Sequence, residues 1–348
     1  MMIQHGGDLY AYPHDLLDFS VNVNPLGLPP AIREAAKQAI DHCAQYPDPQ
    51  CRALRAALSE YEQVPPSQIV FGNGAADLIF RLVQILRPKR ALLTVPSFSE
   101  YEQALNAADC ALSYHKLQPE DQYELNDRIL LQLTEQVDLC FLCNPNNPTG
   151  RLIKKDVIRR IAAQCCQNHI TLVLDECFID FLEHSEAASM KSELNEYPNL
   201  ILLKAFTKTY AMAGLRLGYA LCADEALIRR LHESAQPWSV SIPAQEAALA
   251  ALTQTDYLEE ARSIIQTERP YLEQALTEFG FSVVPSQANF ILFRTDDTAL
   301  MEKLLHQNIL IRSCANFRGL DHHHYRIAVK THAENEQLIH AIAQCREG

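Results

Sequence analysis

The chain has 348 residues, of which 48% are hydrophobic and 21% charged, as in an ordinary globular protein. Its formal net charge of -13 argues against a nucleic-acid partner, because phosphate backbones are bound by clustered lysine and arginine. The first residues, MMIQHGGDLY, lack the basic and apolar regions of a signal peptide. No stretch reaches the ~18 apolar residues of a membrane span, so no membrane partner is expected.

The N-terminal stretch 1–50 is rich in Pro, Asn and Tyr, and we expect residues 1–35 to form an arm that wraps the main body. Short apolar runs then alternate with helical patterns. Strands are expected at 68–71, 91–95, 138–142, 171–174, 199–205 and 218–223. This alternation predicts an α/β fold whose large domain, 36–242, holds a predominantly parallel mixed sheet flanked by helices.

After residue 243 long helical patterns lead into short strands around 282–284, 289–294, 309–312 and 325–329, with a final helix from about 333. A smaller α/β domain is therefore expected over 243–348.

The 11 cysteines are an odd number spread over a long chain, which predicts reduced thiols and a cytoplasmic protein. Cys140 and Cys143 form a C-x-x-C, but within a strand this spacing places the two side chains on opposite faces. Consecutive histidines at 322–324 cannot converge on one ion, and a solvated loop is the better interpretation. No metal site is expected.

Polar residues follow several of the predicted strands, where the ligands of parallel sheets bind. GNGAAD (72–77) could present backbone N–H groups to a phosphate, although a simple tight turn would look the same. NPNNPTG (144–150) is a rigid turn with three asparagines. Asp175 follows the strand at 171–174, where it could equally be a helix N-cap.

Lys208 follows the strand at 199–205, and Arg216 lies between the glycines of GLRLGY (214–219). A lysine there is usually a surface charge, but this one would face the same crevice as Asp175 and Asn147. Together these residues indicate a Schiff-base lysine, an acid for a pyridinium nitrogen, and donors for a phenolate and a phosphate.

The motifs NPNNPTG, LDE (174–176), TK (207–208) and GLRLGY resemble those of the fold-type I aminotransferases of class I/II, over nearly the whole chain. The resemblance implies pyridoxal 5'-phosphate (PLP) as cofactor, with Lys208 as the internal aldimine lysine and Asp175 beside the pyridine nitrogen. It implies a phosphate site made by Ala75, Ala76, Thr207 and Arg216, with Asn147 at the 3′-oxygen and Phe98 stacked on the ring. Tyr46 is similar to the tyrosine that reaches the neighbouring subunit's cofactor, which implies a homodimer.

Two groups within this superfamily compete, the threonine-phosphate decarboxylases of cobalamin biosynthesis and the histidinol-phosphate aminotransferases. Both act on a small phosphorylated amino compound. The segments HGG (5–7), DFSVNVNPLG (18–27), DECFIDF (175–181), QPWSVS (236–241) and RSCANFRGL (312–320) favour the decarboxylases. Phe178 stands where the aminotransferases usually carry a tyrosine that bonds the cofactor.

Resemblance to the decarboxylases implies decarboxylation of O-phospho-L-threonine. The residues then implied to contact that substrate are His5, Gly6, Asn22, Asn147, Arg312 and Arg326. Either arginine could hold either anion, because guanidinium groups suit carboxylate and phosphate alike. A third alternative, a PLP fold that has lost catalysis, is disfavoured by the intact pair of Lys208 and Asp175.

Overall fold

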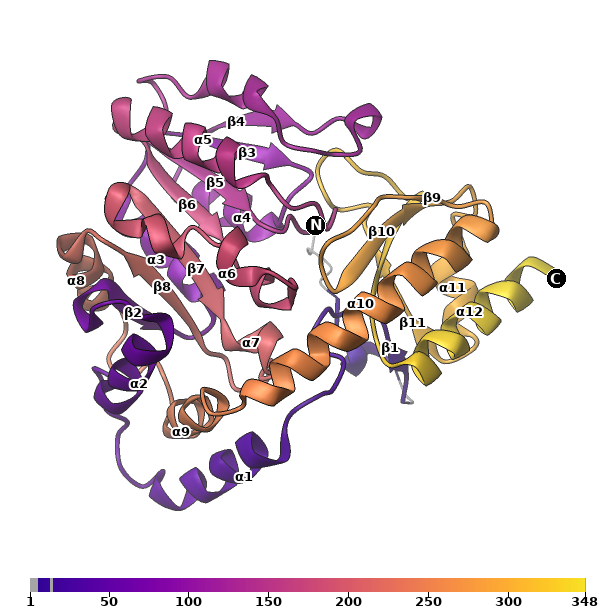
Figure 1. Cartoon of the computed structure of the whole chain (residues 1–348), viewed down its shortest axis with the longest axis horizontal. Helices are drawn as coiled ribbons and strands as arrows, with labels where there is room; N and C mark the ends of the chain where they lie inside the picture. Colours follow the sequence, from indigo (N-terminus) through magenta and orange to yellow (C-terminus); the bar gives the residue numbers. More distant parts are fainter. Residues whose placement is uncertain (1–5, 13–14, 348) are drawn as a thin grey trace.

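The computed structural model describes residues 6–12 and 15–347. A seven-stranded sheet forms the centre of the large domain, with helices packed around it (Figure 1). In spatial order its strands are β2 (Ile69–Gly72), β8 (Gly218–Cys222), β7 (Leu200–Ala205), β6 (Thr171–Asp175), β5 (Leu139–Cys143), β3 (Arg90–Val95) and β4 (Ala111–Lys116). The strands from β7 to β4 pair in parallel, whereas β8 is antiparallel to both of its neighbours. The predicted α/β fold with a predominantly parallel mixed sheet is confirmed.

Six of these strands match the apolar runs in the sequence, but β4 was not predicted. It lies at the edge of the sheet, and of its six residues only His115 is fully buried. An edge strand with one exposed side lacks the continuous apolar run that marks the central strands, so its sequence gives little signal.

The two faces of the sheet carry separate apolar clusters. In β6, Leu172 and Leu174 enter one cluster and Val173 enters the other, as expected from the alternation of side chains along a strand. The same alternation separates Cys140 from Cys143. Among the described residues, no group of three or more His, Cys, Asp and Glu side chains could hold a metal ion.

The helices of the large domain precede its strands, connect them, or, for the last two, follow them. They are α1 (Pro30–Ala39), α2 (Arg52–Glu62), α3 (Ala75–Leu86), α4 (Ser99–Asn106), α5 (Lys155–Gln167), α6 (Ser185–Ala188), α7 (Phe206–Thr209), α8 (Glu225–Glu233) and α9 (Ile242–Ala251). Of these, α6 and α7 have only four residues each, and α7 follows β7 directly.

The small domain contains a four-stranded antiparallel sheet in the order β12 (Arg312–Ser313), β13 (His324–Ala328), β10 (Phe290–Arg294) and β9 (Ser282–Val283). Its helices are α11 (Leu300–Leu305) and α12 (His332–Glu347). The N-terminal strand β1 (Leu17–Asp18) pairs in parallel with β11 (Ile309–Leu310), so the start of the chain is fixed to the small domain. The strands β9, β10 and β13 and the final helix lie where the sequence predicted them, the strand predicted at 309–312 is divided into β11 and β12, and β1 was not predicted.

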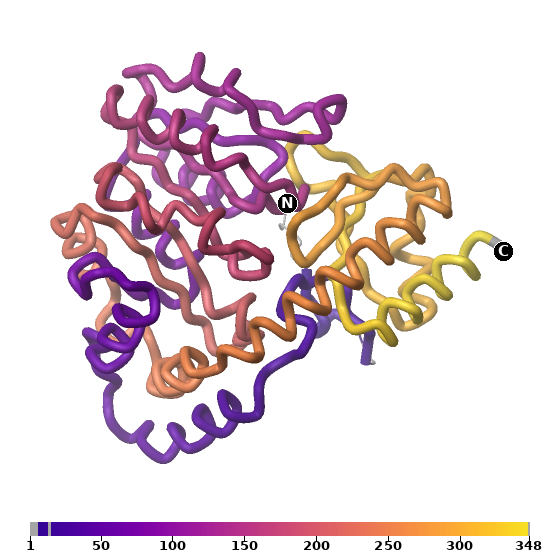
Figure 2. Tube along the Cα trace, viewed as in Figure 1, coloured from indigo at the N-terminus to yellow at the C-terminus, as the bar shows by residue number. Residues whose placement is uncertain are grey.

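The long helix α10 (Thr255–Glu278) runs from the large domain into the small one (Figure 1). Before it, α9 packs on α1 and α2 within the apolar core of the large domain. We therefore propose that the domain boundary lies within α10 rather than at residue 243. In Figure 2 the indigo N-terminal segment passes from the small domain across to α1, so it contacts both domains. In the described part of the chain, no helix is long and apolar enough to cross a membrane.

Candidate active site

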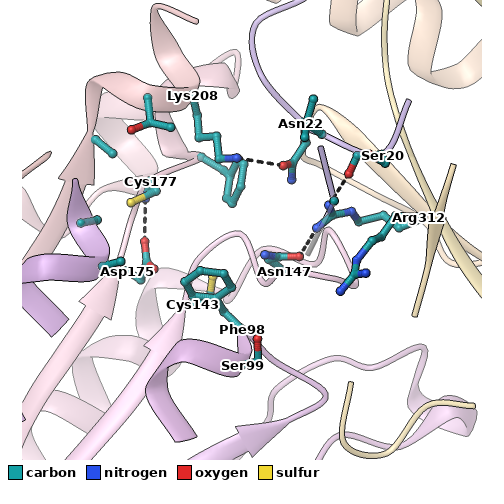
Figure 3. A pocket seen from close by; sticks show the side chains of 18 of the residues that line it. Ser20, Asn22, Phe98, Ser99, Cys143, Asn147, Asp175, Cys177, Lys208 and Arg312 are labelled. Carbon is teal, nitrogen blue, oxygen red and sulfur yellow. Dashed lines mark hydrogen bonds between the residues drawn. The ribbon is translucent and has the colours of Figure 1, made fainter. Parts of the chain in front are cut away.

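A cavity of about 210 Å³ lies where the carboxyl ends of the parallel strands meet the small domain. Side chains from both domains and from the N-terminal segment line it (Figure 3). The lining residues are Gly6, Ser20, Val21, Asn22, Ala75, Ala76, Phe98, Ser99, Cys143, Asn147, Asp175, Cys177, Phe178, Ala205, Thr207, Lys208, Arg216, Arg312, Phe317 and Arg326.

Asp175, the last residue of β6, is 4% exposed and is held by two donors. The Tyr101 hydroxyl donates to its Oδ2 at 2.6 Å, and the Cys177 backbone N–H donates to its Oδ1 at 3.0 Å. Tyr101 is itself stacked on Phe141, with ring centroids 4.9 Å apart. A carboxylate with these two donors is fixed in place at the end of the strand. Its neighbour Glu176 is bound by Ser189 and Met190, and it does not line the cavity.

Lys208 lies in the short helix α7, directly after β7, and its side chain enters the cavity. Its Nζ donates to Asn22 Oδ1 at 3.3 Å, and the two side chains point toward each other in Figure 3. Burial lowers the pKa of this amine to about 8, with a further contribution from the nearby Arg326 cation. An amine with this pKa is partly neutral near physiological pH and can act as a nucleophile.

The N-terminus of α3 supplies backbone N–H groups at Ala75 and Ala76. A side chain on Gly74, which has φ +84°, would come within 2.6 Å of Arg216 Nη2, and one on Gly218 within 2.4 Å of Ala75 N. The two glycines therefore let Arg216 and the strand β8 approach the start of the helix. Helix N-terminus and guanidinium together make a suitable site for an anion.

The rings of Phe98 and Phe178 both lie in the cavity wall. Phe98 is packed edge-on against Tyr101, with ring centroids 5.5 Å apart. Phe178 is 4% exposed, and it packs edge-on against Phe290 at 5.0 Å. The Nζ atom of Lys208 lies 5.8 Å from the Phe178 ring centroid, so the ring faces the amine and offers it no hydrogen bond.

Arg326, from β13, enters the cavity from the small domain. Its Nη1 donates to Asn147 Oδ1 and its Nη2 donates to the Ser20 carbonyl at 3.0 Å. Its guanidinium also lies over the Phe290 ring, 5.2 Å from the centroid. Burial lowers the pKa of Arg326 to about 10, so it is still a cation at neutral pH.

Arg312, from β12, is paired directly across the sheet with Arg326. Its Nη2 donates to Asn316 Oδ1 at 2.9 Å, and its guanidinium lies 5.6 Å from the Phe317 ring centroid. Burial lowers the pKa of Arg312 as well. The cross-strand pairing places two guanidinium groups in the wall of one cavity.

Most residues that the sequence singled out line this cavity: Gly6, Asn22, Ala75, Ala76, Phe98, Asn147, Asp175, Thr207, Lys208, Arg216, Arg312 and Arg326. His5 lies outside the described residues. Tyr46 does not line the cavity of its own chain; it is 76% exposed and stacked on Trp238. Sequence reasoning missed Tyr101, although it lies only three residues after Phe98, at the end of PSFSEY (96–101).

The chain matches the family described as aminotransferase class I and II over residues 14–342. It belongs to this family. The enzyme is 38% identical to a threonine-phosphate decarboxylase of Salmonella typhimurium, over 99% of this chain and 97% of that protein. It is 34% identical to a histidinol-phosphate aminotransferase of Methanosarcina mazei, over 95% of this chain and 88% of that one. The solved structure of the histidinol-phosphate aminotransferase from Clostridium acetobutylicum superposes with a TM-score of 0.88, at 29% identity, covering 94% and 98% of the two chains.

Aminotransferases of class I and II use PLP, and this enzyme is PLP-dependent. The cavity fits that cofactor on its own geometry. Within the described residues, the buried atoms Asn22 Nδ2 and Arg326 Nε have no hydrogen-bond partner. PLP and its substrate would offer hydrogen-bond acceptors to these two donors. The aldehyde of PLP would face Lys208, and its phosphate would face the start of α3.

Proposed function

We propose that this enzyme decarboxylates O-phospho-L-threonine to (R)-1-amino-2-propanol phosphate and CO₂, as a step in cobalamin biosynthesis. The observation that carries the proposal is the pairing of Arg312 with Arg326 in the cavity wall. Among the described residues no ion pair joins either guanidinium to a carboxylate. Glu100 acts on Arg312 and Asp18 on Arg326 as charges that do not pair with them, so two buried cations are left for a ligand with two anionic groups. The 38% identity to a threonine-phosphate decarboxylase over almost the full length supports the same substrate.

Each cofactor contact in the proposal uses a group already fixed in the cavity. Lys208 would hold the cofactor's aldehyde carbon, and Asp175 would accept a hydrogen bond from the pyridine nitrogen. Asn147 would reach the 3′-oxygen and Phe98 would stack on the ring, while Ala75, Ala76, Thr207 and Arg216 would bind the phosphate. When bound, PLP supplies the electron sink for the bond that is broken at the substrate's Cα.

The two arginines differ in their distance from the reacting centre. Arg326 is close enough to Lys208 for its charge to lower the pKa of that amine, whereas Arg312 is not among the charges that act on it most. The substrate carboxylate is bonded to Cα itself, and the phosphate is two bonds further out. We therefore assign the carboxylate to Arg326, and the phosphate to Arg312 with Asn316 and Gly6 beside it.

Decarboxylation requires the Cα–carboxylate bond to stand out of the plane of the cofactor, and transamination requires the Cα–H bond to stand there. Arg326 is held rigidly by Asn147 and Ser20, so it can fix the direction of the carboxylate. Phe178 adds no hydroxyl to the 3′-oxygen, which leaves Asn147 as its side-chain donor. Lys208 would supply the proton that replaces CO₂ at the substrate's Cα.

The competing function is transamination of histidinol phosphate with 2-oxoglutarate, which the 34% identity to a histidinol-phosphate aminotransferase supports. Two incubations separate the activities. CO₂ release from phosphothreonine without any keto acid is the expected result. Glutamate formation from histidinol phosphate and 2-oxoglutarate, without CO₂ release in the first incubation, would overturn the proposal.

We further propose that the enzyme is a homodimer in which Tyr46 completes the partner's site. Tyr46 is 76% exposed and Trp238 45% exposed, and their rings stack with centroids 4.3 Å apart. Two large rings side by side on the surface are suited to an interface, because aromatic side chains are enriched at the buried centre of such contacts.

Hybrid dimers test whether Tyr46 acts across the interface. A dimer of one Tyr46→Ala chain and one Lys208→Ala chain contains a single site in which both residues are intact, provided that Tyr46 acts on the partner's site. Such a hybrid should recover up to half of the native activity, although each parent variant is inactive or weak. A hybrid no more active than its parents would place Tyr46 outside the partner's site.

A further inference from the structure

Four charged side chains form a cluster that does not line the cavity: Glu62 and Lys204 are buried, and Asp180 and Lys191 are partly buried. Lys204 alternates along β7 with Ala205, which lines the cavity, so Lys204 points to the opposite face of the sheet. Lys204 Nζ lies 3.0 Å from Glu62 Oε1 and 3.2 Å from Asp180 Oδ1, and Lys191 Nζ lies 3.0 Å from Glu62 Oε2. Buried ion pairs of this kind add little stability compared with apolar packing, so stability alone does not account for them.

Within this cluster, Asp180 is the member that also contacts the turn carrying Lys208. Its Oδ2 accepts a hydrogen bond from Thr209 Oγ1 at 3.2 Å, and Thr209 directly follows Lys208. Asp180 also comes two residues after Phe178, in a 3-10 turn over Ile179–Phe181. One carboxylate therefore joins the segment that carries the Phe178 ring to the helix that carries the Lys208 amine.

The Lys208 turn depends on such contacts because α7 is only four residues long. On its other side, the Asn24 backbone N–H donates to Lys208 O at 3.0 Å, and Asn24 Nδ2 donates to Thr209 O at 2.9 Å. Asp180 itself is fixed by Lys204 and, through its own carbonyl, by Arg262 of α10 at 2.7 Å. The turn is held between Asn24 on one side and Asp180 on the other.

We propose that Asp180 is a positioning residue which, through Thr209, sets where the Lys208 amine stands relative to the Phe178 ring and the bound cofactor. The inference rests on the proposed role of Lys208 as the residue that holds the cofactor. Asp180 acts through geometry, because it is not among the charged groups that act most strongly on the Lys208 amine.

The test uses Thr209→Val, which removes the hydroxyl donor without changing any charge, and Thr209→Ser, which restores it. The readout is the pKa obtained by titrating the absorbance of the bound cofactor with pH, together with the melting temperature. We expect Thr209→Val to shift that pKa by about 0.5 unit, a threefold change in the proton equilibrium. Thr209→Ser should return it to the native value, and Asp180→Asn should shift it in the same direction as Thr209→Val.

Lys191→Gln is the matched control, because it disturbs the same buried cluster at Glu62 without touching the Lys208 turn. It should lower the melting temperature and leave the cofactor's pKa unchanged. If Thr209→Val and Asp180→Asn behave like this control, Asp180 is merely structural and the inference is wrong.

Borohydride reduction followed by peptide mapping separates this result from a failure of the proposed function. If the reduced cofactor is found on the peptide that contains Lys208, and the cofactor's pKa is unchanged in Thr209→Val and Asp180→Asn, only the role of Asp180 is refuted. If the reduced cofactor is found on another lysine, the assignment of Lys208 is refuted and the positioning role of Asp180 with it.

Discussion

Arg326→Gln separates the stability of the enzyme from its substrate binding. The buried guanidinium has its pKa lowered to about 10, and at about 1.4 kcal/mol for each pH unit this corresponds to roughly 3 kcal/mol against the buried cation. The substitution relieves that cost but removes the hydrogen bonds to Asn147 and Ser20, each worth about 1.5–3 kcal/mol because the donor is charged. The two effects oppose each other, and the free energy of unfolding should fall by at most about 3 kcal/mol.

Substrate binding should weaken in the same variant, for a separate reason. Removing one partner of a buried, hydrogen-bonded charge pair costs about 2–5 kcal/mol, which is at least about 30-fold in affinity. We expect KM for phosphothreonine to rise by that factor in Arg326→Gln. The inhibition constant of the product, 1-amino-2-propanol phosphate, should hardly change, because the product has no carboxylate.

Arg312→Gln is the matched control, since it removes the other guanidinium of the cross-strand pair. This variant should bind both phosphothreonine and the product more weakly, because both carry the phosphate. If Arg326→Gln lowers the affinity for the product as much as the affinity for the substrate, the assignment of the carboxylate to Arg326 is refuted. An unchanged KM would refute the reasoning about the buried cation as a whole.

Three further predictions concern the cofactor site. Phe178→Tyr should leave the melting temperature within about 1 °C and shift the pKa read from the absorbance titration of the bound cofactor; an unchanged titration would show that the position is electronically silent. Because the pKa of Lys208 is lowered to about 8, capture of PLP by the cofactor-free enzyme should accelerate as pH rises through about 8, measured by stopped-flow absorbance. A rate that keeps rising toward pH 10.5 instead would mean that burial does not perturb this amine. Tyr101→Phe removes a donor to a buried carboxylate and should lower the free energy of unfolding by about 1.5–3 kcal/mol, measured with denaturant. Tyr325→Phe, which loses bonds to the neutral carbonyls of Thr298 and Asp297 alone, should cost about 1 kcal/mol. Equal losses in the two variants would show that the bond to Asp175 carries no charge-assisted strength.

The large sheet was predictable because its signal is local. Central parallel strands such as β5 and β6 are buried on both faces, so their sequences are continuous apolar runs. The edge strand β4 has no such run and was missed. The residues at the strand ends were also predictable as a group, because the carboxyl ends of parallel strands meet at one edge of the sheet.

The partners of those residues were not predictable. Tyr101 and Asp175 are 74 positions apart, and Arg326 and Asn147 are 179 positions apart and come from different domains. No periodicity connects such positions, because the first contact depends on how α4 packs on the sheet and the second on how one domain packs on the other. The pairing of Arg312 with Arg326 likewise depends on the register of two short antiparallel strands.

The sequence by itself predicted that Asp175, Asn147 and Lys208 stand at strand ends of one predominantly parallel sheet, since alternating strands and helices can be recognised from the hydrophobic pattern. Only the tertiary structure decided the order of those strands, that Tyr101 fixes Asp175, and that two guanidinium groups share the cavity wall. It also decided that Asp180 joins Phe178 to the Lys208 turn. These contacts depend on how helices and turns pack on the sheet, on the register of short strands, and on how the small domain meets the large one, and hydrophobic pattern specifies none of the three.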